Sequence, residues 1–299
     1  MSKVTSEITK KIMLVRLKIH QLPTSKTDKS VTREVCSDKG VADKMGKWNK
    51  RLFSTGYEPI KECCRKIYAY HKSVTTPFDD DGYAMLRASL CDEYIETMKQ
   101  YTDALAELVS AFVAELDMHI DADRTALGET FNITDYPSAA DIREKVTVEY
   151  AFQSMPTVGG EGINAFTLKE LEKLNEERLQ KVLKDAAEKP LLDLAGLIKK
   201  WADTLSNPTA VFHDTLVGNV REYMQTIDAV NVTDSEAVKK AAAEINALLA
   251  TIDDTNALRK DKKFRSETAN KALAAFDRIQ KTVGRSLVLD AKPKKDANE

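Results

Sequence analysis

Two short segments of the chain alternate apolar and polar side chains. In residues 12–20 and again in residues 146–155, apolar side chains occupy every second position. A period of two is typical of a strand that buries one face. The sequence therefore predicts two strands, which could pair with each other. The polar residues 23–46 predict a flexible loop that could include a short helix.

Helical periodicity dominates the rest of the N-terminal half. Apolar residues recur every three to four positions in residues 59–73 and in a longer segment, residues 83–126. We expect the acidic run at residues 79–81 to cap the longer helix, and Ser138 to cap a short helix over residues 139–145. At about 1.5 Å per residue, the longer helix would exceed 50 Å.

After a linker at residues 155–162, which is rich in glycine and proline, the pattern is helical almost to the end. Pro190 and the pair Asn207-Pro208 divide it into successive helices. Thr233 and Glu236 have the spacing of a capping box at the start of a further helix.

These patterns predict a mainly α (α+β) protein. We expect a long helical hairpin with a small antiparallel β element, followed by a helical C-terminal bundle. The predicted domains are residues 1–156 and 163–284, with a disordered tail at residues 285–299. The apolar stripe of the long helix runs from about Leu105 to Ile120. Because the strands and the helix at 59–73 are short, either the C-terminal helices or a second subunit would have to cover this stripe.

Composition agrees with a helical protein. Of 299 residues, 42% are hydrophobic and 31% charged, while Gly and Pro number only 11 and 8. Neither a secretory signal nor a membrane-spanning segment is visible, which predicts a cytoplasmic protein with no membrane partner. The four cysteines would then be reduced, and they form no CxxC pair of the kind found in zinc ribbons.

Charge is distributed unevenly along the chain. Residues 1–72 carry a net charge of +10, residues 73–165 a net charge of -13, and residues 166–299 a net charge of +1. Cations interleaved with aromatic residues can bind phosphates and stack on bases, so the basic segment is a candidate nucleic-acid site. Alternatively, the basic segment folds against the acidic one. The candidate nucleic-acid-binding residues are Lys44, Lys47, Trp48, Lys50, Arg51, Arg65 and Lys66.

One row of side chains is a candidate metal site. Glu115, His119 and Asp123 recur at every fourth position of the long predicted helix, so they stack along it beside the apolar stripe. A second helix offers no ExxH partner, and a structural histidine at the edge of the core is the alternative. The motifs of serine hydrolases, HExxH metalloproteases, zinc deaminases and kinases are absent from the sequence, and we expect no cofactor.

The order of several short motifs resembles a known family. In the N-terminal half these are the opening strand at 12–20, Leu127-Gly128 with Phe131, Tyr136-Pro137-Ser138, and Glu149-Tyr150-Ala151-Phe152 with Met155-Pro156. In the C-terminal half they are Phe212, Asn219-Val220-Arg221, Asn231-Val232-Thr233 and Asn256-Ala257-Leu258-Arg259. The chain resembles a bacterial domain-of-unknown-function family found in phages and integrative elements, whose genes often lie near a MoxR-type AAA+ ATPase. The resemblance implies a mobile-element origin in a bacterial host and an AAA+ ATPase as a possible partner, but no catalytic residues.

The sequence thus favours a non-catalytic helical assembly or adaptor protein of phage or mobile-element origin. It would act as a homo-oligomer or by docking onto a larger machine. The alternatives are a nucleic-acid-binding protein that uses the basic segment and a metal-dependent enzyme that uses the Glu115 row.

Overall fold

The structure is a computed structural model and confirms the predicted fold class, mainly α with a small antiparallel sheet. None of the helices in the described residues is both long and apolar enough to cross a membrane. The tail predicted at residues 285–299 lies outside the described residues. The structure describes residues 3–42, 45–159, 162–207, 209–211, 213–252 and 254–283.

The chain forms two compact units, each assembled from separate stretches. The bundle unit comprises Met1–Arg16, Lys72–Cys91 and Phe152–Glu299, and the hairpin unit comprises Leu17–His71 and Asp92–Ala151. This division differs from the predicted one, in which residues 1–156 stood apart from residues 163–284. The reason is that the first strand and the strands near residue 80 pack with the C-terminal helices, far away in sequence.

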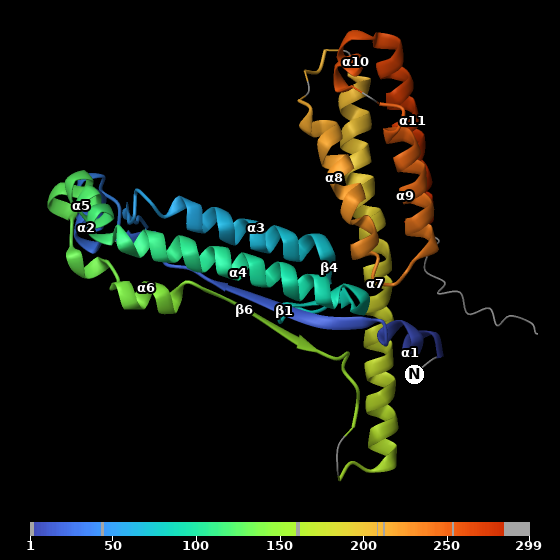
Figure 1. The fold of residues 1–299 in the computed structure, drawn as a ribbon, viewed down its shortest axis with the longest axis horizontal. Helices are drawn as coiled ribbons and strands as arrows, with labels where there is room; N and C mark the ends of the chain where they lie inside the picture. The colour runs from blue at the N-terminus through green and yellow to red at the C-terminus, as the bar shows by residue number, and fades with distance from the viewer. Residues whose placement is uncertain are drawn as a thin grey trace, which may run out of the picture. The chain divides into compact units, whose positions relative to one another are not determined.

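Four strands form one sheet in the order β4-β5-β1-β6 (Figure 1). Both predicted strands are confirmed, as β1 (Ile12–His20) and β6 (Thr147–Gln153), and they are neighbours in the sheet. β4 (Thr75–Pro77) and β5 (Tyr83–Arg87) complete it, and β5 pairs antiparallel with both β1 and β4. The short helix α1 (Lys3–Thr9) precedes β1.

The helix predicted over residues 83–126 is wrong in two places. Residues 83–87 are strand β5 because they pair with strands on both sides, which the local pattern does not show. After η1 (Ala88–Leu90), helix α4 covers Cys91–Ala114, and α5 (Leu116–Leu127) begins beyond Glu115. The break at Glu115 has no sequence signal that we can identify.

The acidic run at residues 79–81 shapes a turn between strands and caps no helix. Asp79 accepts hydrogen bonds from the backbone N–H groups of Asp81 and Tyr83, and Gly82 has a φ of 86°. A glycine suits this left-handed position because it has no Cβ. The turn therefore closes the β4–β5 hairpin.

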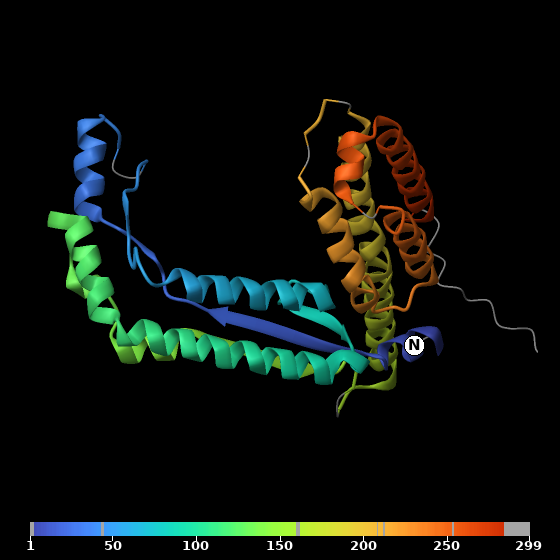
Figure 2. The same cartoon turned by 45° about the horizontal axis from the view of Figure 1, so that its top comes forward.

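The hairpin unit is built on α3 (Glu58–Val74) and α4, which meet through side chains such as the stacked rings of Tyr70 and Tyr94; in Figure 2 the strand β1 is drawn between the two helices. The predicted loop at 23–46 contains the short helix that the sequence allowed, α2 (Lys29–Asp38), which Asp28 caps by accepting from Ser30 and Val31, and also the strand β2 (Ser25–Thr27), which was not predicted. β2 pairs antiparallel with β3 (Asn49–Arg51). The remaining elements are η2 (Gly128–Thr130), η3 (Ile133–Asp135) and α6 (Ala139–Lys145), whose predicted Ser138 cap is confirmed.

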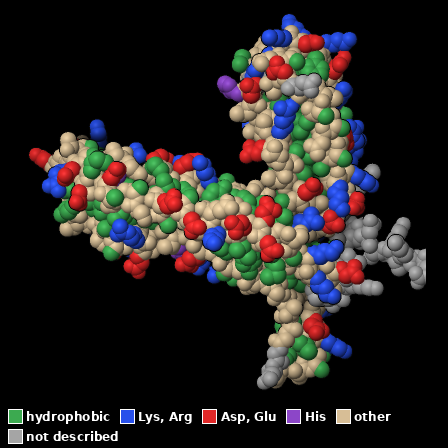
Figure 3. Space-filling model, in the orientation of Figure 1, with side chains coloured by type: hydrophobic (Ala, Val, Ile, Leu, Met, Phe, Trp, Pro, Cys, Tyr) green, Lys and Arg blue, Asp and Glu red, His purple; other side chains and the backbone are tan. Residues whose placement is uncertain are grey.

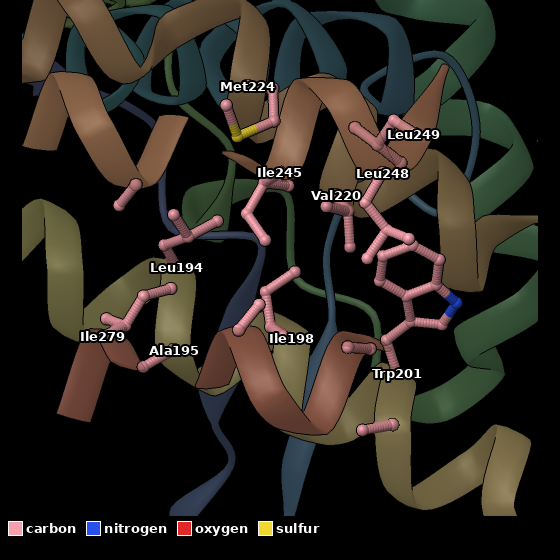
Figure 4. Packing of buried hydrophobic residues seen from close by; sticks show 14 of the residues in the cluster. Leu194, Ala195, Ile198, Trp201, Val220, Met224, Ile245, Leu248, Leu249 and Ile279 are labelled. Atoms are coloured by element: carbon pink, nitrogen blue, oxygen red, sulfur yellow. The ribbon is translucent and has the colours of Figure 1, made fainter. Parts of the chain in front are cut away.

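The bundle unit holds the largest apolar core, part of which Figure 4 shows. Its helices are α7 (Ala165–Ser206), α8 (Thr215–Val230), α9 (Glu236–Leu249), α10 (Thr255–Lys260) and α11 (Lys262–Val283). Trp201, Ile198 and Leu194 of α7 are fully buried against the other helices. The C-terminal bundle predicted from periodicity is therefore present.

Pro190 does not end a helix as the sequence suggests, because α7 continues through it. A proline inside a helix costs about 3 kcal/mol through its missing N–H and its ring. Here Pro190 is buried, and its carbonyl oxygen accepts a hydrogen bond from the Tyr223 hydroxyl at 3.1 Å. Packing on both sides of the proline offsets this cost.

The predicted capping box at Thr233 and Glu236 is also wrong. The N-cap of α9 is Ser235, whose side chain makes no capping hydrogen bond. Instead the buried Asn231 amide accepts from the Ser235 N–H at 2.8 Å and donates to the Ser235 carbonyl at 3.2 Å. An amide that both accepts and donates holds the entry to α9 in place of the capping box.

Candidate functional site

The three residues of the candidate metal row occupy different environments on α5. His119 and Asp123 are buried, whereas the side chain of Glu115 is 64% exposed. Glu115 lies at the N-cap of the helix, and its carboxylate is 3.8 Å from His119 Nε2. The row therefore faces inward only in part, and its two inner members contact the loop that precedes α3.

Asp123 is the centre of a buried polar cluster. It is 1% exposed and accepts hydrogen bonds from the backbone N–H of Phe53 at 2.6 Å and from that of Ser54 at 3.0 Å. The hydroxyl of Ser54 and the hydroxyl of Tyr136, at 2.8 Å, also donate to it. Burial and the hydrogen bond to Asp123 raise the pKa of Tyr136, so this hydroxyl remains a donor. Four donors thus surround the carboxylate in place of a cation.

The ring of His119 packs closely against its neighbours beside this cluster. Its Nδ1 lies 3.0 Å from the hydroxyl of Thr55, and its ring stacks on Phe112 with centroids 4.9 Å apart. Gly56 lies so close to the ring that an added Cβ would meet the imidazole at 2.2 Å. Within the part of the chain that the structure describes, no group of three or more His, Cys, Asp or Glu side chains could hold a metal. The bonds of His119 and Asp123 to the loop before α3 support the alternative, a structural histidine at the edge of the core.

The basic candidate residues also separate on folding. The ammonium group of Lys50 is buried and lies 2.6 Å from Asp135 Oδ2, 3.4 Å from Asp28 Oδ2 and 2.7 Å from the Thr130 carbonyl. Lys26 donates to the other oxygen of Asp135, at 2.6 Å. Burial by itself would lower the pKa of Lys50, but the hydrogen bonds and charges of the two aspartates raise it. Lys50 is thus an internal cation that joins the basic and acidic segments.

The other basic candidates lie in different settings. Arg65 is exposed on α3 and forms ion pairs with Glu58 and Glu62 of the same helix. Lys47, Arg51 and Lys66 are exposed, Trp48 is half-buried, and Lys44 lies outside the described residues. Because Lys50 and Arg65 already have acidic partners, the structure does not present the predicted set as one free cationic surface.

An exposed apolar surface on α7 escaped the sequence analysis. We call residues 165–178 the α7 arm. Phe166 is 76% exposed there, Leu171 38% and Leu174 60%, whereas Leu179 and Leu183, one to two turns further on, are fully buried. Figure 3 shows hydrophobic side chains among charged ones at this end of the helix. Helical periodicity indicates which residues share a face of the helix and not where the covering element ends, so it did not distinguish the exposed residues from the buried ones.

Neither a protein-family model, nor a curated protein, nor a solved structure matches the chain. The buried side chains of Asp123, His119 and Lys50 in the hairpin unit have polar partners within that unit, while large apolar side chains of the α7 arm are exposed.

Proposed function

We propose that the protein is a non-catalytic helical assembly protein that self-associates through the α7 arm. The proposal rests on the exposure of Phe166, Leu171 and Leu174 within three turns of one helix. Large apolar side chains gathered on an exposed helix mark protein interaction surfaces. The partner that we propose is a second copy of the chain, because closed homo-oligomers are the commonest way to bury such a surface.

The long-helix stripe, which first suggested self-association, does not contribute to this proposal. Leu105, Val109, Phe112, Leu116 and Ile120 are all buried within the chain. The chain itself therefore covers this stripe without a second subunit, and Phe112 packs on Phe53 and Tyr57 of the segment before α3 rather than on the C-terminal helices. Support for self-association comes instead from the α7 arm.

Binding is favoured over catalysis by the environments of His119 and Asp123. Each of these side chains is buried and bonded to the loop at residues 53–56, where it holds the fold of the hairpin unit. An AAA+ ATPase, the partner implied by the family resemblance, would be the larger machine onto which the assembled protein docks. A mobile-element origin belongs to the same proposal.

The expected interaction is weak. Fully burying a Leu or Phe side chain stabilises by about 1.5–3 kcal/mol, and association costs about 4 kcal/mol or more in lost freedom. Partial burial of three apolar side chains from each copy therefore exceeds the cost of association by only a small free energy. We therefore expect a dimer that forms at roughly tens of micromolar and dissociates on dilution.

Size exclusion coupled to light scattering tests the proposal on the full chain. We expect a mass above the 33.4 kDa of one chain at high concentration, and a return to 33.4 kDa for the double variant Phe166→Glu/Leu174→Glu. Leu192→Glu is the matched control, since Leu192 lies on the same helix and is 49% exposed. A wild-type chain that stays monomeric, or an arm variant that associates as the wild type does, contradicts the proposal.

A further inference from the structure

A groove in the bundle unit lies between the β4–β5 hairpin and α7. Its volume is about 240 Å³. Phe78, Val182 and Ala186 supply apolar walls, and the carboxylates of Asp79, Asp80 and Asp185 stand around them. Lys189 also lines the groove, but its ammonium group is held by Asp193 at 2.7 Å.

The size and the lining of this groove suit one long basic side chain. Sites for drug-sized molecules measure about 300–1,000 Å³, so this groove is smaller. A lysine or arginine has an apolar stem that can lie on apolar walls while its charged head reaches carboxylates. Arg178 does not line the groove, but its guanidinium lies 5.5 Å from the centroid of the Phe78 ring, so this ring already has one cation beside it.

The described part of the chain ends at about the same level along α7 as this groove. Helix α11 runs antiparallel to α7, because Arg265 bonds the Thr204 carbonyl while Phe276, further along α11, lies 5.4 Å from the ammonium group of Lys199. Both helices rise about 1.5 Å per residue, so each residue forward along α11 moves about one residue back along α7. Val283, the last residue of α11, is then level with about residue 186 of α7 when counted from the Arg265 contact and with about residue 192 when counted from the Phe276 contact.

The residues that follow Val283 carry a matching charge. Lys292, Lys294 and Lys295 lie close together in the sequence, nine or more residues beyond Val283. Nine extended residues span up to about 30 Å, and a helix with its side chains is about 10–12 Å across. The length of chain is thus sufficient to pass around α7 and reach the groove.

We propose that this groove is a binding site for a basic peptide segment, and that residues 292–295 of the same chain occupy it. The lysines pair with Asp80 and Asp185, and their stems cover Phe78 and Val182. Because the contact is mainly ionic and near the surface, added salt weakens it. A partner with a basic segment has to displace these residues before it can enter the groove.

Zero-length carbodiimide cross-linking of the full chain, mapped by mass spectrometry, tests the contact. We expect Lys292, Lys294 or Lys295 to link to Asp80 or Asp185, and the links to disappear in Asp80→Asn/Asp185→Asn and at high salt. Asp203→Asn is the matched control on α7 and should leave the links intact. Equal linking of these lysines to Asp203 and to the groove would overturn the proposal. Mixing isotope-labelled and unlabelled chains separates links within a chain from links between chains, and a majority between chains also overturns it.

A binding measurement provides a second test. The probe is a fluorescent peptide with the sequence of residues 284–299, added to full-length protein at low salt. The variant with Lys292, Lys294 and Lys295 changed to Glu should bind the probe at least tenfold more tightly than wild type, because its groove is vacant. Adding Asp80→Asn/Asp185→Asn to this variant should abolish binding. Equal affinity of the wild type and the triple variant would contradict occupancy by the chain's own lysines.

Discussion

Gly56 lies directly against the imidazole of His119. A Cβ at Gly56 would stand 2.2 Å from both Cε1 and Nε2 of that ring, and the φ of Gly56 is 78°. Both facts exclude a side chain at this position. The contact holds the loop before α3 on the face of α5, next to the hydrogen bonds of Asp123.

Gly56→Ala should therefore destabilise the protein by more than backbone strain alone explains. Gly82→Ala is the matched control, because Gly82 has a φ of 86° and no atom within 4 Å of an added Cβ. We expect about 1 kcal/mol for Gly82→Ala and at least about 3 kcal/mol for Gly56→Ala, measured by urea unfolding. Combining Gly56→Ala with His119→Ala should cost less than the sum of the two changes, since the clash is gone. Strict additivity would show that the two residues are not in contact.

Asp123→Ala should be strongly destabilising. The change leaves the N–H groups of Phe53 and Ser54 and the hydroxyl of Tyr136 without their acceptor in a buried setting. Each unsatisfied donor costs about 1–3 kcal/mol. Asp121→Ala on the same helix removes only an exposed ion pair with Arg124 and should cost less than about 1 kcal/mol. Urea unfolding of the two variants compares these costs, and similar values would show that the Asp123 cluster does not stabilise the fold.

Lys50 and Lys47 should respond differently to the same substitution. Lys50→Ala removes the buried one of the two ammonium groups that lie 2.6 Å from the Asp135 carboxylate, and breaking a buried ion pair typically costs about 3–5 kcal/mol. Lys47 is exposed, so Lys47→Ala should change the free energy of unfolding by less than about 0.5 kcal/mol. Thermal and urea unfolding measure both. If Lys50→Ala left stability unchanged and reduced nucleic-acid binding, Lys50 would be a binding residue and not a structural one.

The stability of the protein should fall as the pH falls from about 6.5 to 4. Buried His71, whose Nδ1 is 2.8 Å from the Tyr94 hydroxyl, has a pKa lowered by burial to about 4. Between these values the unfolded chain binds a proton that the folded chain does not, so the free energy of unfolding decreases with acidity. The full effect is on the order of 3 kcal/mol.

Urea unfolding at several pH values measures this dependence. His71→Gln removes the titrating group and should flatten the curve between pH 6.5 and 4. His213→Gln is the control, because His213 is exposed and should leave the slope unchanged. A His71→Gln curve parallel to that of the wild type would assign the pH dependence to other groups.

Local sequence determined much of the secondary structure. The strands β1 and β6, the helix α3 and the Ser138 cap of α6 were all predictable, because each depends on side chains within a few residues of one another. The helical C-terminal half was predictable for the same reason. Periodicity and capping are local properties, and they were also sufficient to predict the fold class.

Tertiary structure decided the features that depend on distant partners. Residues 83–87 became a strand because β1 and β4 lie on either side of it, and α7 passes through Pro190 because packing offsets the loss of one hydrogen bond. Lys47 and Lys50 stand three residues apart in the same basic segment, yet only Lys50 meets Asp135. Asp135 is 85 residues further along the chain, so no local pattern distinguishes the two lysines. Burial depends on which distant surface covers a side chain, and only the folded chain brings that surface to it.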